Sequence, residues 1–129
     1  MKLVKPHKGG PTFGGVFSND ELTKVDLDKV YILNLQNSDQ PGSHWTLLYA
    51  GWYFDSYGVP ATKRMSQYVT SYNPYDYQGL SKNSCGHMCM YVASRIIAGL
   101  KPYTGDLVPN KSLHNENVLE RFFYGSISG

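Results

Sequence analysis

The chain has 129 residues, 12 Lys or Arg against 10 Asp or Glu, a formal net charge of +2 and 41% hydrophobic residues. This length suits one modest core, so we expect a single domain over residues 1–129. So small a net charge does not favour nucleic-acid binding. No apolar run approaches the roughly 20 residues that a membrane-spanning helix needs, and the start, MKLVKPHKGG, lacks the apolar core of a secretory signal. We therefore expect a protein that is neither secreted nor inserted into a membrane.

The first half of the chain predicts an irregular arm followed by strands. Residues 1–19 are rich in glycine and include Pro11, which is typical of an N-terminal arm without regular structure. Val30 to Leu35, VYILNL, is a strand by its β-branched and aromatic residues. His44 to Asp55, HWTLLYAGWYFD, predicts two strands around a tight turn at Ala50-Gly51.

A two-residue turn would fix the register of this hairpin. Tyr49 then pairs with Trp52, and Thr46 lies opposite Asp55. Because paired residues share a face and successive residues alternate, the hairpin has two distinct faces. They consist of His44, Thr46, Leu48, Tyr53, Asp55 and Tyr57 on one side and Trp45, Leu47, Tyr49, Trp52 and Phe54 on the other. We expect the second set to face the core, and the first set to look toward a functional site in which His44 and Asp55 are diagonal neighbours.

The second half of the chain is expected to be mainly helical. Ala61 to Val69 predicts a short helix after Pro60, and Thr70 to Tyr77 predicts an extended segment. Leu113 to Tyr124 predicts a closing helix with Val118, Leu119, Phe122 and Phe123 as its apolar side.

The central element is Ser81 to Ile97, SKNSCGHMCMYVASRII. Its apolar residues recur in steps of three and four, which predicts a largely buried helix that begins near Cys85. Asn83 or Ser84 is placed to cap this helix, and Gly99 with the following Pro102 would end it.

Cys85 would lie in the first turn of the central helix, where free N–H groups and the helix dipole favour a thiolate. A cysteine hydrolase also needs a base, a group that orients the base, and donors to the oxyanion. His44 is the candidate base, and Asp55 is the candidate for holding its imidazole. Gln78 is the candidate oxyanion donor together with the backbone N–H of Cys85. Gly86 would let a substrate approach the nucleophile closely.

Each of these residues also has a structural interpretation when it is taken alone. A lone cysteine is mostly a buried, inert thiol, and His44, Asp55 and Gln78 could be a strand histidine, a turn residue and a polar loop residue. The predicted register favours the joint, catalytic interpretation. His87 lies two residues beyond Cys85 on the helix, where side chains do not face each other, so we expect it at the rim. No second Cys/His cluster accompanies the two cysteines, so we expect neither a metal site nor a cofactor.

Four motifs in a fixed order carry a family resemblance. They are His44-Trp45, Tyr53-Phe54-Asp55-Ser56-Tyr57-Gly58, Gln78 and Ser84-Cys85-Gly86. Over residues 30–98 the chain resembles the family of cysteine proteases that includes the adenovirus endopeptidase (adenain) and the SUMO-deconjugating Ulp/SENP enzymes. The resemblance implies an α+β fold with a papain-like (adenain-type) core, in which the central helix packs on a small, mostly antiparallel sheet. It implies the same catalytic roles for His44, Asp55, Gln78 and Cys85, and a substrate site lined by Trp45, Ser84 and Gly86.

The resemblance also implies a function. We expect a cysteine endopeptidase that matures viral structural or capsid precursors at Gly-containing sites, as a monomer in the cytoplasm or nucleus of an infected cell and in the virion. A protease that removes ubiquitin-like proteins is the alternative, and a non-catalytic binding module or an acyltransferase is a more distant one. The chain departs from the family in the short step from His44 to Asp55. It offers no counterpart of adenain's activating disulfide, and its scattered Lys and Arg give no support to stimulation by DNA.

Overall fold

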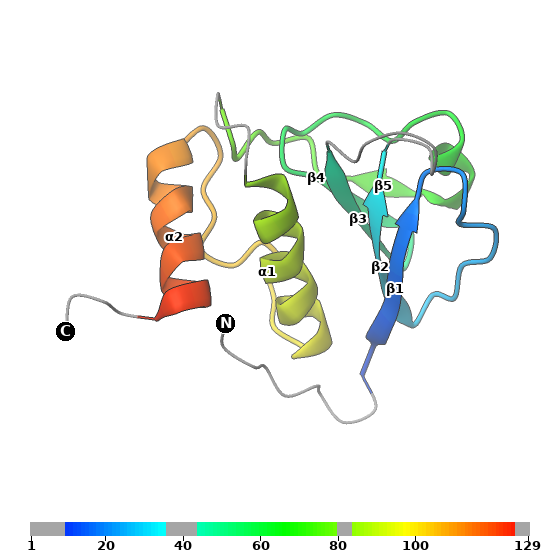
Figure 1. The fold of residues 1–129 in the computed structure, drawn as a ribbon, viewed down its shortest axis with the longest axis horizontal. Helices are drawn as coiled ribbons and strands as arrows, with labels where there is room; N and C mark the ends of the chain where they lie inside the picture. Colours follow the sequence, from blue (N-terminus) through cyan, green and yellow to red (C-terminus); the bar gives the residue numbers. More distant parts are fainter. Residues whose placement is uncertain (1–9, 36–43, 80–83, 126–129) are drawn as a thin grey trace.

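A mixed sheet and two helices form an α+β fold, in which α1 lies between the sheet and α2 (Figure 1). The computed structural model describes residues 10–35, 44–79 and 84–125. Within these ranges the elements are β1 (Thr12–Ser18), β2 (Lys29–Asn34), β3 (Trp45–Tyr49), β4 (Trp52–Asp55), the 3-10 helix η1 (Met65–Tyr68), β5 (Ser71–Tyr72), α1 (Cys85–Ile97) and α2 (Ser112–Tyr124).

The five strands lie in their chain order, β1-β2-β3-β4-β5. The central strands β2, β3 and β4 are antiparallel, whereas β1 runs parallel to β2 and β5 runs parallel to β4. The expectation of a mostly antiparallel sheet is therefore wrong, because half of the pairings are parallel. Two parallel strands need a connection long enough to return the chain to the end of the sheet at which the first strand began. Residues 19–28 and 56–70 provide the two connections of this length.

The prediction of an irregular arm over residues 1–19 is wrong for residues 12–18, which form β1. Residues 1–9 lie outside the described residues. The glycines that suggested a loop belong to an irregularity of this edge strand, where the register with β2 shifts between Phe13 and Gly15. Gly15 has a φ of 123°, and a Cβ on Gly14 would lie 2.6 Å from the ring of Tyr31. Glycine is thus used here for a bulge and for a close approach, not for a loop.

The predicted β3–β4 hairpin register is confirmed. Tyr49 pairs with Trp52, and Thr46 pairs with Asp55. Ala50 and Gly51 have φ values of 48° and 82°, both positive, as the two central residues of a type I′ turn require. The loop therefore has two residues, and the alternation of side chains along both strands is fixed.

The interpretation of the two hairpin faces needs a correction, because both faces are buried. Leu47 and Phe54 belong to the larger core cluster, which includes residues of α1 and α2. Leu48 and Tyr53 are fully buried in a second cluster on the opposite face, with Leu22, Tyr31, Leu33 and Met65. The face of Leu48 and Tyr53 therefore does not look toward a site. The two candidate residues of this hairpin lie instead where β3 begins and β4 ends.

The central helix is confirmed as a buried helix that starts at Cys85. Its buried residues are Cys85, Met88, Cys89, Tyr91, Val92, Ala93 and Ile96. The chain turns out of the helix at Gly99, which has a φ of 72° and donates its N–H to the carbonyl of Ile96. None of the helices in the described ranges is long and apolar enough to cross a membrane.

The predictions of a helix within Ala61 to Val69 and of a capping residue for α1 are only partly correct. Within Ala61 to Val69 the structure has just the short 3-10 helix η1. Ser84 precedes α1 but makes no side-chain capping bond, because its hydroxyl donates to the Glu116 carboxylate of α2. The other predicted cap, Asn83, lies outside the described residues. The closing helix begins at Ser112, and Leu119 and Phe123 are its buried apolar residues.

Candidate active site

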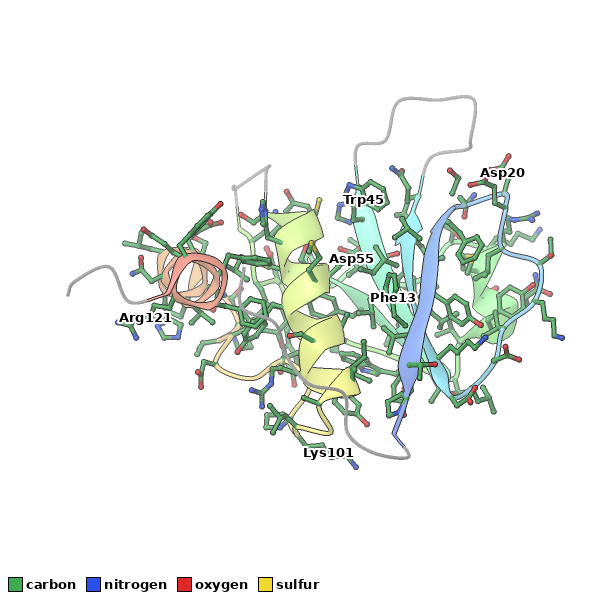
Figure 2. All side chains as sticks on the ribbon, turned by 60° about the horizontal axis from the view of Figure 1, so that its bottom comes forward. Phe13, Asp20, Trp45, Asp55, Lys101 and Arg121 are labelled. Carbon is green, nitrogen blue, oxygen red and sulfur yellow. The ribbon has the colours of Figure 1, made fainter. Side chains whose placement is uncertain are left out.

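The candidate residues converge at the N-terminal end of α1. Cys85 is the first residue of this helix, His44 immediately precedes β3, and Asp55 is the last residue of β4. In Figure 2, Trp45 and Asp55 lie in the part of the sheet that is beside α1. Three positions far apart in the sequence thus meet because two strand ends and one helix start lie together.

A hydrogen bond joins His44 and Asp55. His44 Nε2 lies 3.0 Å from Asp55 Oδ1, and the Asp55 side chain is only 2% exposed. The same carboxylate oxygen accepts the backbone N–H of Tyr57 at 2.8 Å. A buried carboxylate that is held by the backbone fixes both the position of the imidazole and the nitrogen that it uses.

The second nitrogen of the imidazole serves Cys85. His44 hydrogen-bonds to the Cys85 side chain, and Nδ1 is the atom left for this contact because Nε2 faces Asp55. The hydrogen bond with Asp55, followed by that with Cys85, raises the pKa of His44 from 6.5 to about 9, although burial opposes the change. His44 is therefore a cation at neutral pH.

Opposing effects act on the pKa of the Cys85 thiol. Burial alone would raise the pKa of Cys85, but the hydrogen bond from His44 and the backbone N–H groups of Trp45 and Gly86 outweigh it, so the pKa lies below its ordinary value. Cys89, one turn further along α1, is completely buried, and burial raises its pKa. The pKa values of two thiols on one helix are thus shifted in opposite directions. Cys85 interacts with His44, whereas Cys89 is a core residue.

Gln78 joins this group through Ser56, the residue after Asp55. Gln78 is fully buried, and its Oε1 accepts a hydrogen bond from the Ser56 hydroxyl. Its backbone N–H donates to Asp76 Oδ1 at 3.0 Å. Hydrogen bonds therefore hold both the backbone and the side chain of Gln78, and its side chain contacts the residue that follows β4.

The three residues expected on the substrate side have different surroundings. Trp45 is half-buried, and its indole lies 3.4 Å from where a Cβ on Gly86 would be. Gly86 therefore lies against the indole, beside Cys85. Ser84 is turned toward α2 by its bond to Glu116, and it lines a pocket of about 270 Å³ together with His87. His87 is exposed, as expected of a rim residue, and its ring packs against Phe123.

Two contributions to the site come from groups to which the sequence analysis gave no role. The ring of Tyr57 packs on the imidazole of His44, with ring centroids 5.3 Å apart. The backbone N–H of Trp45 bonds to the Cys85 sulfur, which no side-chain pattern can reveal. The predicted register already puts Tyr57 on the same face as His44, and the contact between their rings agrees with it.

The arrangement lacks a metal centre within the part of the chain that is described, where no group of three His, Cys, Asp or Glu side chains could hold an ion. In comparisons with known proteins, no family model matches this chain, and no curated protein matches it by sequence.

Proposed function

We propose that the protein is a cysteine hydrolase with Cys85 as its nucleophile. The observation that carries the proposal is the hydrogen-bonded chain from Asp55 through His44 to Cys85 at the start of α1. A nucleophile, a base and an orienting carboxylate in this sequence are what acyl transfer by a thiol requires.

The chemistry follows from the charge states of these groups. The Cys85 thiolate attacks the carbonyl carbon, and the electron pair of the C=O bond moves onto the oxygen. The backbone N–H of Cys85, which has no partner within the helix, and the Gln78 amide are the proposed donors to this oxyanion. When the tetrahedral species collapses, the imidazolium of His44 gives its proton to the leaving amine. Water, deprotonated by the now neutral His44, then hydrolyses the thioester and restores the thiol pair.

The finer assignment draws on the family resemblance together with the geometry. A cysteine at a helix start that packs on a sheet, with a histidine at a strand start, supports a papain-like core of the adenain type. The family resemblance implies a narrow cleft that admits only glycine near the scissile bond, and the half-buried indole of Trp45 lies against Gly86, the residue after Cys85. We therefore propose an endopeptidase that cleaves viral structural precursors at Gly-containing sites, in the infected cell and in the virion.

The test compares the two cysteines. We expect Cys85→Ala to abolish cleavage of fluorogenic peptides built around Gly-Gly and Gly-X-Gly, while Cys89→Ala, the matched control, keeps activity. Iodoacetamide should label Cys85 much faster than Cys89, because the pKa of Cys85 is lowered whereas complete burial raises that of Cys89. Equal labelling of the two thiols, or cleavage by Cys85→Ala, would contradict the assignment.

A substrate panel separates the endopeptidase from the alternative of a deconjugating protease. The panel contains capsid-type precursors with internal Gly-X-Gly sites and a ubiquitin-like protein linked through its Gly-Gly tail to a lysine. Cleavage of the internal sites supports maturation of precursors. Cleavage of the isopeptide bond alone would replace that proposal by deconjugation.

A further inference from the structure

Tyr57, two residues beyond the end of β4, contacts two members of the site in different ways. Its backbone N–H donates to Asp55 Oδ1 at 2.8 Å, and its half-buried ring packs on the His44 imidazole. The ring centroids are 5.3 Å apart and the two planes are inclined by 35°, which is closer to stacking than to an edge-on contact. The chain segment that holds the carboxylate therefore also sets the position of an aromatic ring against the imidazole.

The Tyr57 ring acts on a part of the imidazole that the hydrogen bonds do not reach. Asp55 and Cys85 bind the two nitrogens of His44, so both contacts lie at the edge of the imidazole, near its plane. Such contacts do not cover the faces of the ring. A tilted stack against Tyr57 opposes rotation of the imidazole out of its plane. The edge contacts and the face contact thus restrict different motions of the same ring.

The face of an aromatic ring also attracts a cation. His44 is a cation at neutral pH because its pKa is raised to about 9, chiefly by the hydrogen bond with Asp55. A cation within about 6 Å of the centroid of an aromatic ring is attracted by the negative face of that ring. The Tyr57 ring lies within this range, and its face favours the charged imidazole without accepting the proton.

The charges around Tyr57 leave its ring neutral. Burial raises the pKa of the phenol above its ordinary value of 10, and the negative charges of Cys85, Asp76 and Asp55 act in the same direction. Asp55 of β4 and Cys85 of α1 are also the charged groups that act on His44. The phenol therefore stays protonated while His44 titrates near pH 9, so the attraction between its ring and the imidazolium is kept over that range.

We infer that Tyr57 is a positioning residue, whose ring holds the His44 imidazole in its hydrogen-bonded plane and favours its cationic form. This inference rests on the proposed hydrolase function. In that reaction the imidazolium gives its proton to the leaving amine, and the interaction with His44 lowers the pKa of Cys85. A ring that favours the cation therefore supports both the formation of the nucleophile and the later transfer of the proton.

The experiment exchanges the ring and follows the titration of His44 directly. Tyr57→Leu keeps an apolar side chain against the imidazole but removes the aromatic face, and Tyr57→Phe keeps the face but removes the hydroxyl. Nuclear magnetic resonance of protein that carries labelled histidine gives the pKa of His44, whose signal is assigned by its loss in His44→Asn. In Tyr57→Leu this pKa should fall by about 0.5 to 1 pH unit, and kcat should fall by about 3- to 10-fold with a smaller change in KM.

Alkylation gives a second readout that needs no substrate. Iodoacetamide reacts with the thiolate form of Cys85, so the acidic limb of its pH profile follows the pKa of that thiol. In Tyr57→Leu this limb should move to higher pH, because a less favoured cation at His44 lowers the pKa of Cys85 to a smaller extent. Tyr57→Phe should keep both the wild-type limb and the wild-type titration of His44, since the inference concerns the ring and not the hydroxyl.

Tyr103→Leu is the matched control. It removes another half-buried tyrosine, which packs on Tyr49 and Trp52 at the other end of the β3–β4 hairpin. This variant should lower the melting temperature but leave the titration of His44 and the alkylation profile unchanged. If Tyr57→Leu does not fold, phenylalanines with one, two and three ring fluorines at position 57 keep the shape of the ring and weaken its negative face stepwise, and the pKa of His44 should fall in the same order.

Several results would overturn the role of the Tyr57 ring. They are an unchanged pKa of His44 in Tyr57→Leu, an equal loss in Tyr57→Phe and Tyr57→Leu, or a fall in kcat that leaves the alkylation profile in place. The hydrolase proposal fails separately, if the wild type is alkylated selectively at Cys85 but hydrolyses no substrate. The titration of His44 across the variants would still decide the role of Tyr57 in that case.

Discussion

Replacing Asp55 by Asn tests how strongly the carboxylate controls the imidazole. The exchange keeps the size of the buried side chain and leaves an oxygen that accepts the Tyr57 N–H, so the fold should persist. The hydrogen bond to Asp55 is the largest cause of the rise in the pKa of His44 from 6.5 to about 9. At about 1.4 kcal/mol per pKa unit, this whole rise corresponds to about 3 kcal/mol of preference for the cation.

Two consequences should be visible in the pH dependence of kcat/KM. In the wild type, activity should fall on the alkaline side near pH 9, where His44 loses the proton that the leaving amine needs. In Asp55→Asn this limb should move toward neutral pH. The acidic limb should move up, because a neutral imidazole no longer lowers the pKa of Cys85. Turnover at pH 7 should fall by about 10²- to 10⁴-fold, the upper figure being the effect of the same exchange in the serine-protease triad that serves as the general example.

Stability gives an independent measurement with a definite sign. A group whose native pKa is raised stabilises the fold fully below its unfolded pKa, and this contribution is lost as the pH rises through the native value. The difference in free energy of unfolding between the wild type and Asp55→Asn should therefore be largest near pH 6, at most about 3 kcal/mol, and should shrink as the pH passes 9. Asp106→Asn, at a surface position away from His44, is the control. An unmoved alkaline limb with a loss of turnover below about threefold would refute the role of Asp55 in this chain.

Two further predictions concern the β3–β4 turn. Ala50 has a φ of 48°, which costs an L-residue about 1 kcal/mol and which asparagine tolerates better, so Ala50→Asn should raise the urea midpoint without changing turnover; a lower midpoint would contradict the type I′ assignment. Inserting two residues between Ala50 and Gly51 keeps the alternation of both strands and should cost well under about 1 kcal/mol, whereas one residue must bulge out or turn Asp55 away from His44. Turnover and melting temperature of both insertions decide this, and an inactive two-residue variant beside an active one-residue variant would be the contrary result.

The elements that could be predicted from the sequence are those with local signals. The Ala50-Gly51 turn and the strands around it follow from turn chemistry and side-chain alternation, and both are confirmed. The helix that starts at Cys85 follows from an apolar stripe with helical spacing. Once the register was fixed, the proximity of His44 and Asp55 followed from it without any long-range information.

The features that escaped prediction depend on the rest of the fold. The pairing of β1 with β2 was not predicted, because Gly14 and Gly15 make the sequence of β1 typical of a loop, whereas the sequence of β2 is typical of a strand. The second core could have been anticipated from Leu47-Leu48, since two adjacent apolar residues on one strand indicate burial of both faces. Recognising it would have moved the expected site from a face of the sheet to the ends of its strands.

The turn after β4 explains how a small chain can hold the proposed catalytic site rigidly. Gly58 has a φ of 76°, and a Cβ there would lie 2.5 Å from the carbonyl oxygen of Pro74, so the turn packs directly against the segment that leads to Gln78. Its N–H donates to the carbonyl of Asp55 at 2.8 Å, which closes the turn behind the carboxylate. Groups that act on a transition state must be held in place before the reaction, because reorienting them during it would cost the stabilisation that they provide. Here one closed turn, fastened to its neighbour through backbone contacts, supplies that rigidity to His44 through Asp55 and to Gln78 through Ser56.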